Sequence, residues 1–285
     1  MTLFIDFRTA NTGGAVTDPR MIDVDLAALP TLGPKLDDHA IENAVTGRNL
    51  LLGTHGFNVH RLEGVRSLAR LDGHLRAQGW LGSADLFIGV LWPGDFWIPA
   101  INYPFEGTDA IDCGKRLAAF CNKELESAQS FSFLSHSLGA RLILEAVKRL
   151  NVRATSVCLA AAAINRDCLA TEYAAAARNS DSISVLASHE DRVLQVAFPV
   201  GDPISNVLHR DHEYFRAALG YAGPPRPAAA PIKAPWQIPD KEDYGHGNYL
   251  PPSAEVAPAD PHPQWLRVAE FMANAFNRRP QGWPS

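Results

Sequence analysis

Short apolar runs alternate with longer amphipathic stretches along much of this chain. The runs lie at residues 50–54, 86–92, 131–134, 155–159 and 183–187. Apolar runs of this length without polar alternation predict strands that are covered on both faces. Strands that alternate with helices of roughly 10–15 residues predict a parallel, doubly wound sheet. We therefore expect an α/β fold with helices on both faces of a mostly parallel sheet.

The helices are predicted from apolar residues at helical spacing. Such spacing occurs in residues 62–79, 111–125, about 166–178 and 265–276. Residues 1–8 alternate like a first strand. The first 48 residues are expected to supply edge strands and turns, in an order that the pattern does not determine.

The composition fits one domain that spans residues 1–285. The apolar content is 46% and the charged content is 20%, as in ordinary globular proteins. Residues 224–263 are rich in proline, which excludes regular helix and central strand. A linker between two domains is one interpretation. We expect an ordered surface excursion, because one following helix is too little for a second core and Trp236, Tyr244 and Tyr249 provide anchors.

Charge and cysteine content narrow the function further. The net charge of −5 provides no basic surface for nucleic acid. The sequence contains no apolar run long enough for a membrane span, and residues 1–8 do not resemble a signal peptide. The four cysteines, at positions 113, 121, 158 and 168, form no CxxC pair and are expected to be buried. These features favour a reducing, cytoplasmic compartment; the oligomeric state stays open.

Residues 135–140 supply the most specific motif of the chain. Ser137 lies between a predicted strand and a predicted helix, in the sequence Ser-His-Ser-Leu-Gly-Ala. This arrangement resembles the G-x-S-x-G nucleophile elbow of α/β-hydrolases, in which a tight strand-to-helix turn exposes a serine hydroxyl. Gly139 matches the second glycine, and Ser135 replaces the first.

A serine hydroxyl needs a base, and the base needs an orienting carboxylate. In this fold the acid and then the base follow the serine along the chain. Asp191 comes just after the predicted strand 183–187 and is the favoured acid, with Glu190 as its rival. The alternative role for Asp191 is the N-cap of the following helix.

The base is expected among the histidines that follow the acid: His209, His212, His246 and His262. His246 is favoured because Gly245 and Gly247 allow its loop to approach the serine. The first two lie in a charged stretch that is typical of a solvated surface. His262 lies between prolines and stays an alternative, as does an exposed loop position for His246.

Two backbone amides are expected to stabilise the oxyanion. The first is the amide of Leu138, and the second is that of Phe57, in the loop after strand 50–54. His55 and His136 are interpreted as structural. Aromatic residues after strand 86–92 are expected either to line a substrate pocket or to form a cluster under a loop. They are Trp92, Phe96, Trp97, Tyr103 and Phe105.

Four segments resemble a bacterial α/β-hydrolase group of largely uncharacterised, esterase- or lipase-like proteins. They are residues 51–59, with their His-Gly-Phe-Asn loop, and residues 91–94, 135–141 and 187–194. The resemblance spans residues 48–250. It implies an α/β-hydrolase fold with Ser137 as nucleophile, Asp191 as acid and His246 as base.

These features predict a serine hydrolase that cleaves small-molecule carboxylic esters through an acyl-enzyme, without metal or organic cofactor. An acyltransferase on the same scaffold is one alternative. A non-enzymatic binding protein of hydrolase fold is another. A metallohydrolase using His209, Asp211 and His212 is disfavoured, because no HExxH-like ligand spacing occurs.

Overall fold

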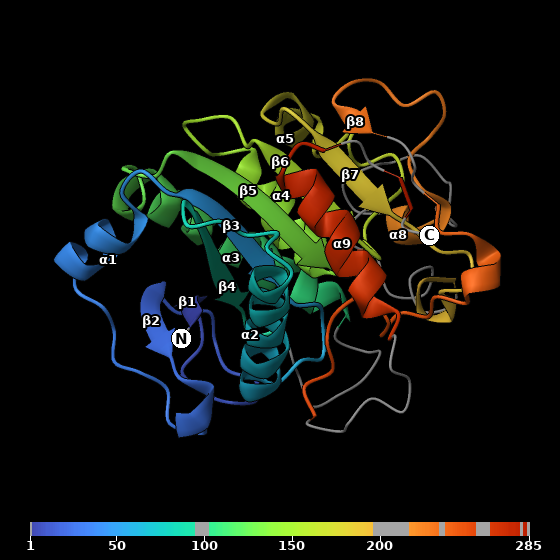
Figure 1. The fold of residues 1–285 in the computed structure, drawn as a ribbon. Coiled ribbons are helices and arrows are strands. Elements are labelled where there is room, and N and C mark those ends of the chain that lie inside the picture. The colour runs from blue at the N-terminus through green and yellow to red at the C-terminus, as the bar shows by residue number, and fades with distance from the viewer. Residues whose placement is uncertain are drawn as a thin grey trace.

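Eight strands of the described chain form one mostly parallel sheet, in the order β2-β1-β4-β3-β5-β6-β7-β8 (Figure 1). The computed structural model describes residues 2–94, 103–195, 217–233, 237–254, 263–279 and 282–283, with the backbone alone for 103–107. Only the pair β1–β2 is antiparallel among these strands. The strands are β1 (Thr2–Asp6), β2 (Arg20–Val24), β3 (Asn49–Thr54), β4 (Asp85–Leu91), β5 (Ser130–His136), β6 (Ser156–Ala160), β7 (Ile183–Leu186) and β8 (Ile232–Lys233).

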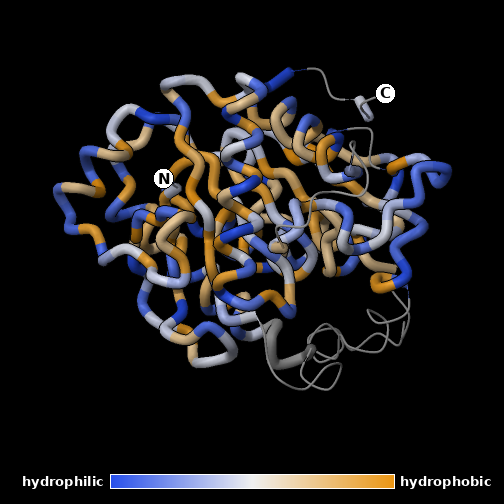
Figure 2. Tube along the Cα trace, turned by 60° about the horizontal axis from the view of Figure 1, so that its bottom comes forward, coloured by the Kyte–Doolittle hydropathy of each residue, from blue (hydrophilic) through white to orange (hydrophobic). Residues whose placement is uncertain are grey.

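The apolar composition of the central strands matches their position in the sheet, where helices cover both faces. Every residue of β6 and β7 is buried, and in β3 only the first residue is partly exposed. Figure 2 shows hydrophobic segments concentrated in the interior strands and hydrophilic segments around them. The predicted doubly wound, mostly parallel sheet is therefore confirmed.

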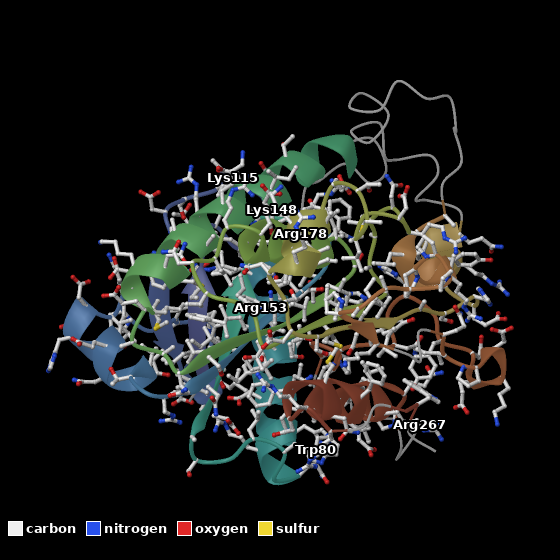
Figure 3. The ribbon with its side chains drawn as sticks, turned by 90° about the horizontal axis from the view of Figure 1, so that it is seen from above. Trp80, Lys115, Lys148, Arg153, Arg178 and Arg267 are labelled. Atoms are coloured by element: carbon white, nitrogen blue, oxygen red, sulfur yellow. The ribbon has the colours of Figure 1, made fainter. Side chains whose placement is uncertain are left out.

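Helices α2 and α9 lie on one face of the sheet, and α3 and α4 lie on the other (Figures 1 and 3). Viewed from above, Trp80 and Arg267 mark the first layer, and Lys115 and Lys148 mark the second. The helices are α1 (Asp38–Val45), α2 (Arg61–Ala77), α3 (Tyr103–Glu124), α4 (Gly139–Val147), α5 (Ala174–Arg178), α8 (Leu219–Ala222) and α9 (Trp265–Phe276), with 3₁₀ turns η1 (Leu26–Ala28) and η2 (Asp240–Glu242).

Helix α4 is enclosed by the sheet and by α3. All nine of its residues are buried, including Arg141 and Glu145. Gly114 of α3 permits the close approach, because a Cβ there would lie 2.5 Å from the carbonyl oxygen of Leu142. The N-terminus of α4, which follows the predicted elbow, is thus held between two layers.

Three features of the chain differ from the sequence-based expectation. The helix predicted over about 166–178 is confined to α5, because the amide of Arg166 donates to Ala217 (3.0 Å) and the segment after it forms turns. Tyr103 and Phe105 lie in the first turn of α3 rather than in a loop. Strand β8 was not predicted, since two residues after a proline show no pattern.

The proline-rich segment is anchored where the structure describes it. Tyr244 and Tyr249 are fully buried, as expected of anchors, whereas Trp236 lies outside the described residues. The assignment of the whole chain to one domain stays a prediction.

All four cysteines are buried and unbridged, as expected. Burial raises the pKa of the Cys158 thiol to about 12, so it is not a thiolate at neutral pH. Among the described residues, no helix combines the length and the apolar character that crossing a bilayer requires.

Candidate active site

The elbow between β5 and α4 holds Ser137 in a left-handed conformation with φ of 54°. A non-glycine residue in this region is strained and persists only when its surroundings determine it. The Ser137 amide donates to the carbonyl of Ala160 on β6 (3.0 Å). The Ser137 carbonyl accepts from the amides of Ala140 (3.1 Å) and Ala163 (3.2 Å). Backbone bonds on both sides therefore maintain the turn.

Two glycines let neighbouring backbone pass close to the elbow. A Cβ at Gly139 would lie 2.4 Å from the His55 carbonyl oxygen, and a Cβ at Gly56 would lie 2.8 Å from the Ser137 Cβ. Ser135 occupies the place of the first motif glycine and is fully buried. Its Oγ has no hydrogen-bond partner in the part of the chain that is described. A small side chain is thus tolerated there.

Three residues from separate parts of the chain form one hydrogen-bonded row. Ser137 Oγ lies 2.8 Å from His246 Nε2, and His246 Nδ1 lies 2.8 Å from Asp191 Oδ2. Asp191 is fully buried, and the side chain of His246 is 19% exposed. A carboxylate can only accept, so Nδ1 carries the proton and Nε2 accepts from the hydroxyl. The structure thus brings together the three residues expected to act as nucleophile, acid and base.

Asp191 has two bonds, one for each carboxylate oxygen. Its Oδ2 accepts from His246, and its Oδ1 accepts from the amide of Leu194 at 3.0 Å. The carboxylate therefore caps the turn that follows β7 while it contacts the histidine. The two roles weighed for this residue are geometrically compatible. Glu190, the rival acid, lines the neighbouring cavity instead.

Side chains hold the loop that carries His246. The Tyr244 hydroxyl donates to the Gln264 carbonyl (2.7 Å), and the rings of Tyr244 and Tyr249 meet edge to face with centroids 5.8 Å apart. The Ser67 hydroxyl of α2 donates to the Pro251 carbonyl (2.7 Å). Neither neighbouring glycine adopts a positive φ, although their freedom motivated the choice of His246. Anchoring therefore decides the position of this loop.

A comparison with protein-family models finds a match over residues 36–218, more than half of the chain, to the model described as alpha/beta hydrolase of unknown function (DUF900). The chain belongs to this family. The matched region contains Ser137 and Asp191, whereas His246 follows it. Curated proteins provide no significant match.

The loop after β3 of this hydrolase packs against the nucleophile elbow. His55 is buried, its Nδ1 donates to the Gly56 carbonyl (2.8 Å), and its carbonyl accepts from the Trp92 indole (3.1 Å). The His55 and Trp92 rings stack with centroids 5.9 Å apart. These contacts shape the segment that leads to Phe57, as expected for His55. Leu138 lies at the N-cap of α4, where the first amides have no partner within the helix.

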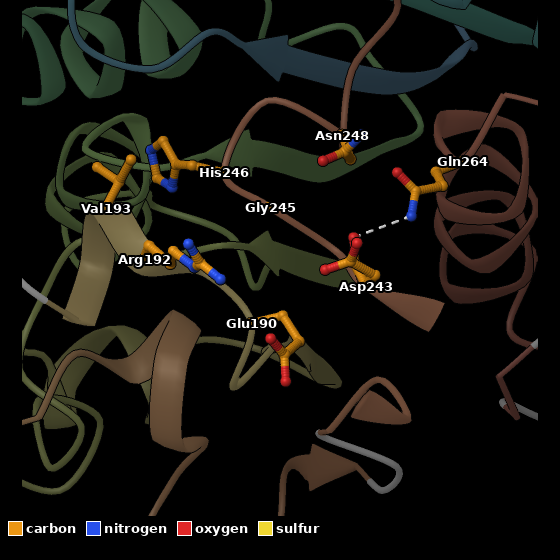
Figure 4. A pocket seen from close by; sticks show the side chains of 8 residues that line it. All are labelled: Glu190, Arg192, Val193, Asp243, Gly245, His246, Asn248 and Gln264. Atoms are coloured by element: carbon orange, nitrogen blue, oxygen red, sulfur yellow. Dashed lines mark hydrogen bonds between the residues drawn. The ribbon is translucent and has the colours of Figure 1, made fainter. Parts of the chain in front are cut away.

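A cavity of about 530 Å³ opens beside His246 (Figure 4). The loop that carries His246 lines one side of it, and Glu190 and Arg192 lie across from that loop. Val193, Asp243, Gly245, Asn248 and Gln264 complete the lining. The side-chain amide of Gln264, at the N-cap of α9, donates to the Asp243 carbonyl of this loop at 3.1 Å. Most of the side chains that line the cavity are therefore polar.

Trp92 does not line this cavity, contrary to the expectation of a pocket residue. It is fully buried and supports the loop after β3. Six other candidates lie outside the described residues: Phe96, Trp97, His209, Asp211, His212 and His262. Within the described ranges, no cluster of three His, Cys, Asp or Glu side chains could hold a metal ion.

One contact at the site was not predicted. The His136 ring reaches the main chain of His246, with Nε2 2.8 Å from the carbonyl oxygen. The only signal in the sequence was the position of His136 beside the serine. Such a position cannot reveal a partner 110 residues away.

Proposed function

We propose that this protein is a serine hydrolase that cleaves carboxylic esters of small molecules through an acyl-enzyme. The observation that carries the proposal is the row of two 2.8 Å bonds from Ser137 through His246 to Asp191. A binding protein that had lost catalysis would need no base aligned on the hydroxyl. This alignment favours the enzyme over the non-enzymatic alternative.

In the first half-reaction His246 Nε2 takes the hydroxyl proton as Ser137 Oγ attacks the ester carbonyl. Asp191 holds the imidazole in the Nδ1–H tautomer and stabilises the imidazolium. The amides of Leu138 and Phe57 donate hydrogen bonds to the oxyanion that forms; one such donor is typically worth about 3–4 kcal/mol. Collapse breaks the bond to the alkoxy oxygen, which leaves as an alcohol with the proton from His246.

In the second half-reaction water replaces the alcohol. His246 takes a proton from water as the oxygen attacks the acyl-enzyme carbonyl, and returns that proton to Ser137 Oγ as the acid leaves. The residues named supply every proton transfer, so the proposal requires no metal or organic cofactor. An acyltransferase would share the first half-reaction and use an alcohol or amine in the second.

The buried, unbridged state of the four cysteines supports a further part of the proposal, a reducing cytoplasmic location. The central sheet and the anchored proline-rich segment support one domain over the length of the chain.

Labelling with a fluorophosphonate tests the nucleophile. The wild type and Ser135→Ala should be labelled, and Ser137→Ala should not, because the reagent captures only an activated serine. Ser135→Ala is the matched control, since it removes a buried hydroxyl two residues away. On a panel of p-nitrophenyl esters, Ser137→Ala should lose about 10⁴-fold or more in kcat/KM. An unlabelled wild type, or a labelled Ser137→Ala, would refute the proposal.

A further inference from the structure

His136 occupies the last position of β5, directly before Ser137. Its Nε2 lies 2.8 Å from the backbone oxygen of His246, and the two rings are 4.9 Å apart between centroids. The side chain therefore touches the same residue whose imidazole contacts Ser137 Oγ. It contacts that residue through the main chain, whereas Asp191 contacts it through the ring.

The proton on His136 can be placed from its partner. A carbonyl oxygen only accepts, so Nε2 must donate. Burial is the largest cause that lowers the pKa of His136 to about 3, and the nearby His246 lowers it further. His136 is thus neutral at neutral pH, with its one proton on Nε2. A neutral ring also places no like charge beside the imidazolium that forms on His246 during the reaction.

Two further segments confine the ring of His136. A Cβ at Gly56 would lie 2.9 Å from its Nδ1, so the loop after β3 packs against that nitrogen. The ring of Tyr249, which is fully buried, lies 5.9 Å away between centroids. The half-buried side chain therefore packs between the loops that bear Phe57 and His246.

We infer that His136 is a positioning residue, which ties the main chain of His246 to the elbow and so keeps the base on the Ser137 hydroxyl. This inference rests on the proposed function. Two bonds then fix the base: its ring donates to Asp191, and its backbone carbonyl accepts from His136. Misplacement of a catalytic group by 1 Å can cost about 10²-fold in rate. The His246 loop follows η2, and in its described part, residues 243–254, the backbone itself forms no strand or helix, so we expect the second bond to contribute to the rate.

A pair of variants separates the donor from the packing. In His136→Gln an amide N–H can lie near the position of Nε2, whereas His136→Met has a similar length and no donor. His136→Met should lower kcat by about 10- to 100-fold and leave KM within about twofold, because binding precedes the use of the base. The rate of fluorophosphonate labelling should fall by the same factor. His136→Gln should recover most of both losses.

Circular dichroism and thermal melting, with assays well below the midpoint, establish that the compared variants are folded. Equal kcat in the wild type, His136→Met and His136→Gln would overturn the inference, as would equal losses in both variants. If His136→Met does not fold, ¹⁵N NMR of histidine-labelled wild type decides. Between pH 5 and 8 His136 should stay neutral with Nε2 protonated; titration in this range, or a proton on Nδ1, would overturn the inference.

Ser137→Ala separates the two claims. If Ser137→Ala is inactive and the His136 variants behave like the wild type, the positioning role fails and the proposed function stands. If Ser137→Ala keeps its activity, the proposed function fails and the positioning role fails with it.

Discussion

The nucleophile and the base of the proposed triad are held in different ways. Ser137 lies between β5 and α4, and backbone hydrogen bonds to Ala160 and Ala163 maintain its turn. His246 lies in a loop between η2 and α9 that is held through side chains of distant segments. An elbow built from backbone tolerates side-chain change, as Ser135 in place of glycine illustrates. A loop held by a few side chains depends on each of them.

The largest expected effect is the loss of the base. His246→Ala should lower kcat/KM by about 10⁴- to 10⁶-fold, because no other group takes the proton of Ser137. His189→Ala is the control, since its side chain is 47% exposed and lies 3.4 Å from Asp240. Ester turnover measures both. A comparable loss in His262→Ala, with activity kept in His246→Ala, would show that the base is His262.

Asp191→Asn should lower kcat by about 10⁴-fold, since an amide can hold the imidazole in the wrong tautomer. Its stability should change little, because asparagine is also a good N-cap for the amide of Leu194. Asp191→Ala removes both contacts and should lose in addition about 1 kcal/mol of unfolding free energy. Kinetics and urea unfolding separate the two functions. Similar stability of the two variants would contradict the cap.

Tyr249→Ala tests the anchoring of the base loop. Truncation of a fully buried aromatic should cost roughly 3–5 kcal/mol of unfolding free energy and should also lower kcat per folded molecule. Phe271→Ala removes an equally buried ring that belongs to α9 rather than to this loop. Phe271→Ala should lose stability but keep kcat per folded molecule. Tyr249→Phe should keep most of the stability and most of kcat. Equal kcat in Tyr249→Ala and Phe271→Ala would remove the contrast between elbow and loop.

The smallest expected effect is a pH dependence of stability that His136 introduces at the elbow. Its pKa is lowered to about 3 by burial, so the unfolded chain binds the proton more readily. As the pH falls below about 6.5, the free energy of unfolding should decrease by up to about 1.4 kcal/mol per pH unit from this group. His136→Gln should remove this slope. Burial also lowers the pKa of His74, so the difference between the two proteins is the quantity to measure.

Urea unfolding of the wild type and His136→Gln at pH 7, 6 and 5 measures that difference. Between pH 7 and pH 5 the free energy of unfolding should fall by more in the wild type than in His136→Gln. Parallel curves would show that His136 is not held neutral by the fold.

Local patterns predicted the sheet and its strands closely. The five central strands begin and end within a few residues of their predicted bounds. A strand that is covered on both faces needs apolar residues throughout, so its length is visible in the sequence as a continuous apolar run. The structure of the segment after β6 was predicted less well. Its apolar spacing predicts a helix, but the amide of Arg166 bonds to the carbonyl of Ala217, a distant partner that no local pattern reveals.

The sequence by itself predicted the alternation of strands and helices, the tight turn at Ser137 and the chain order of the acid and the base that follow it, because these depend on neighbours along the chain. The sequence also reduced the candidates for the base to four histidines and favoured His246 among them. Only the tertiary structure decided which imidazole reaches the hydroxyl, that Trp92 is buried under a loop, and that His136 touches the main chain of His246. Those contacts join residues far apart in the sequence, and their distances depend on how the carboxyl ends of parallel strands meet at one edge of the sheet.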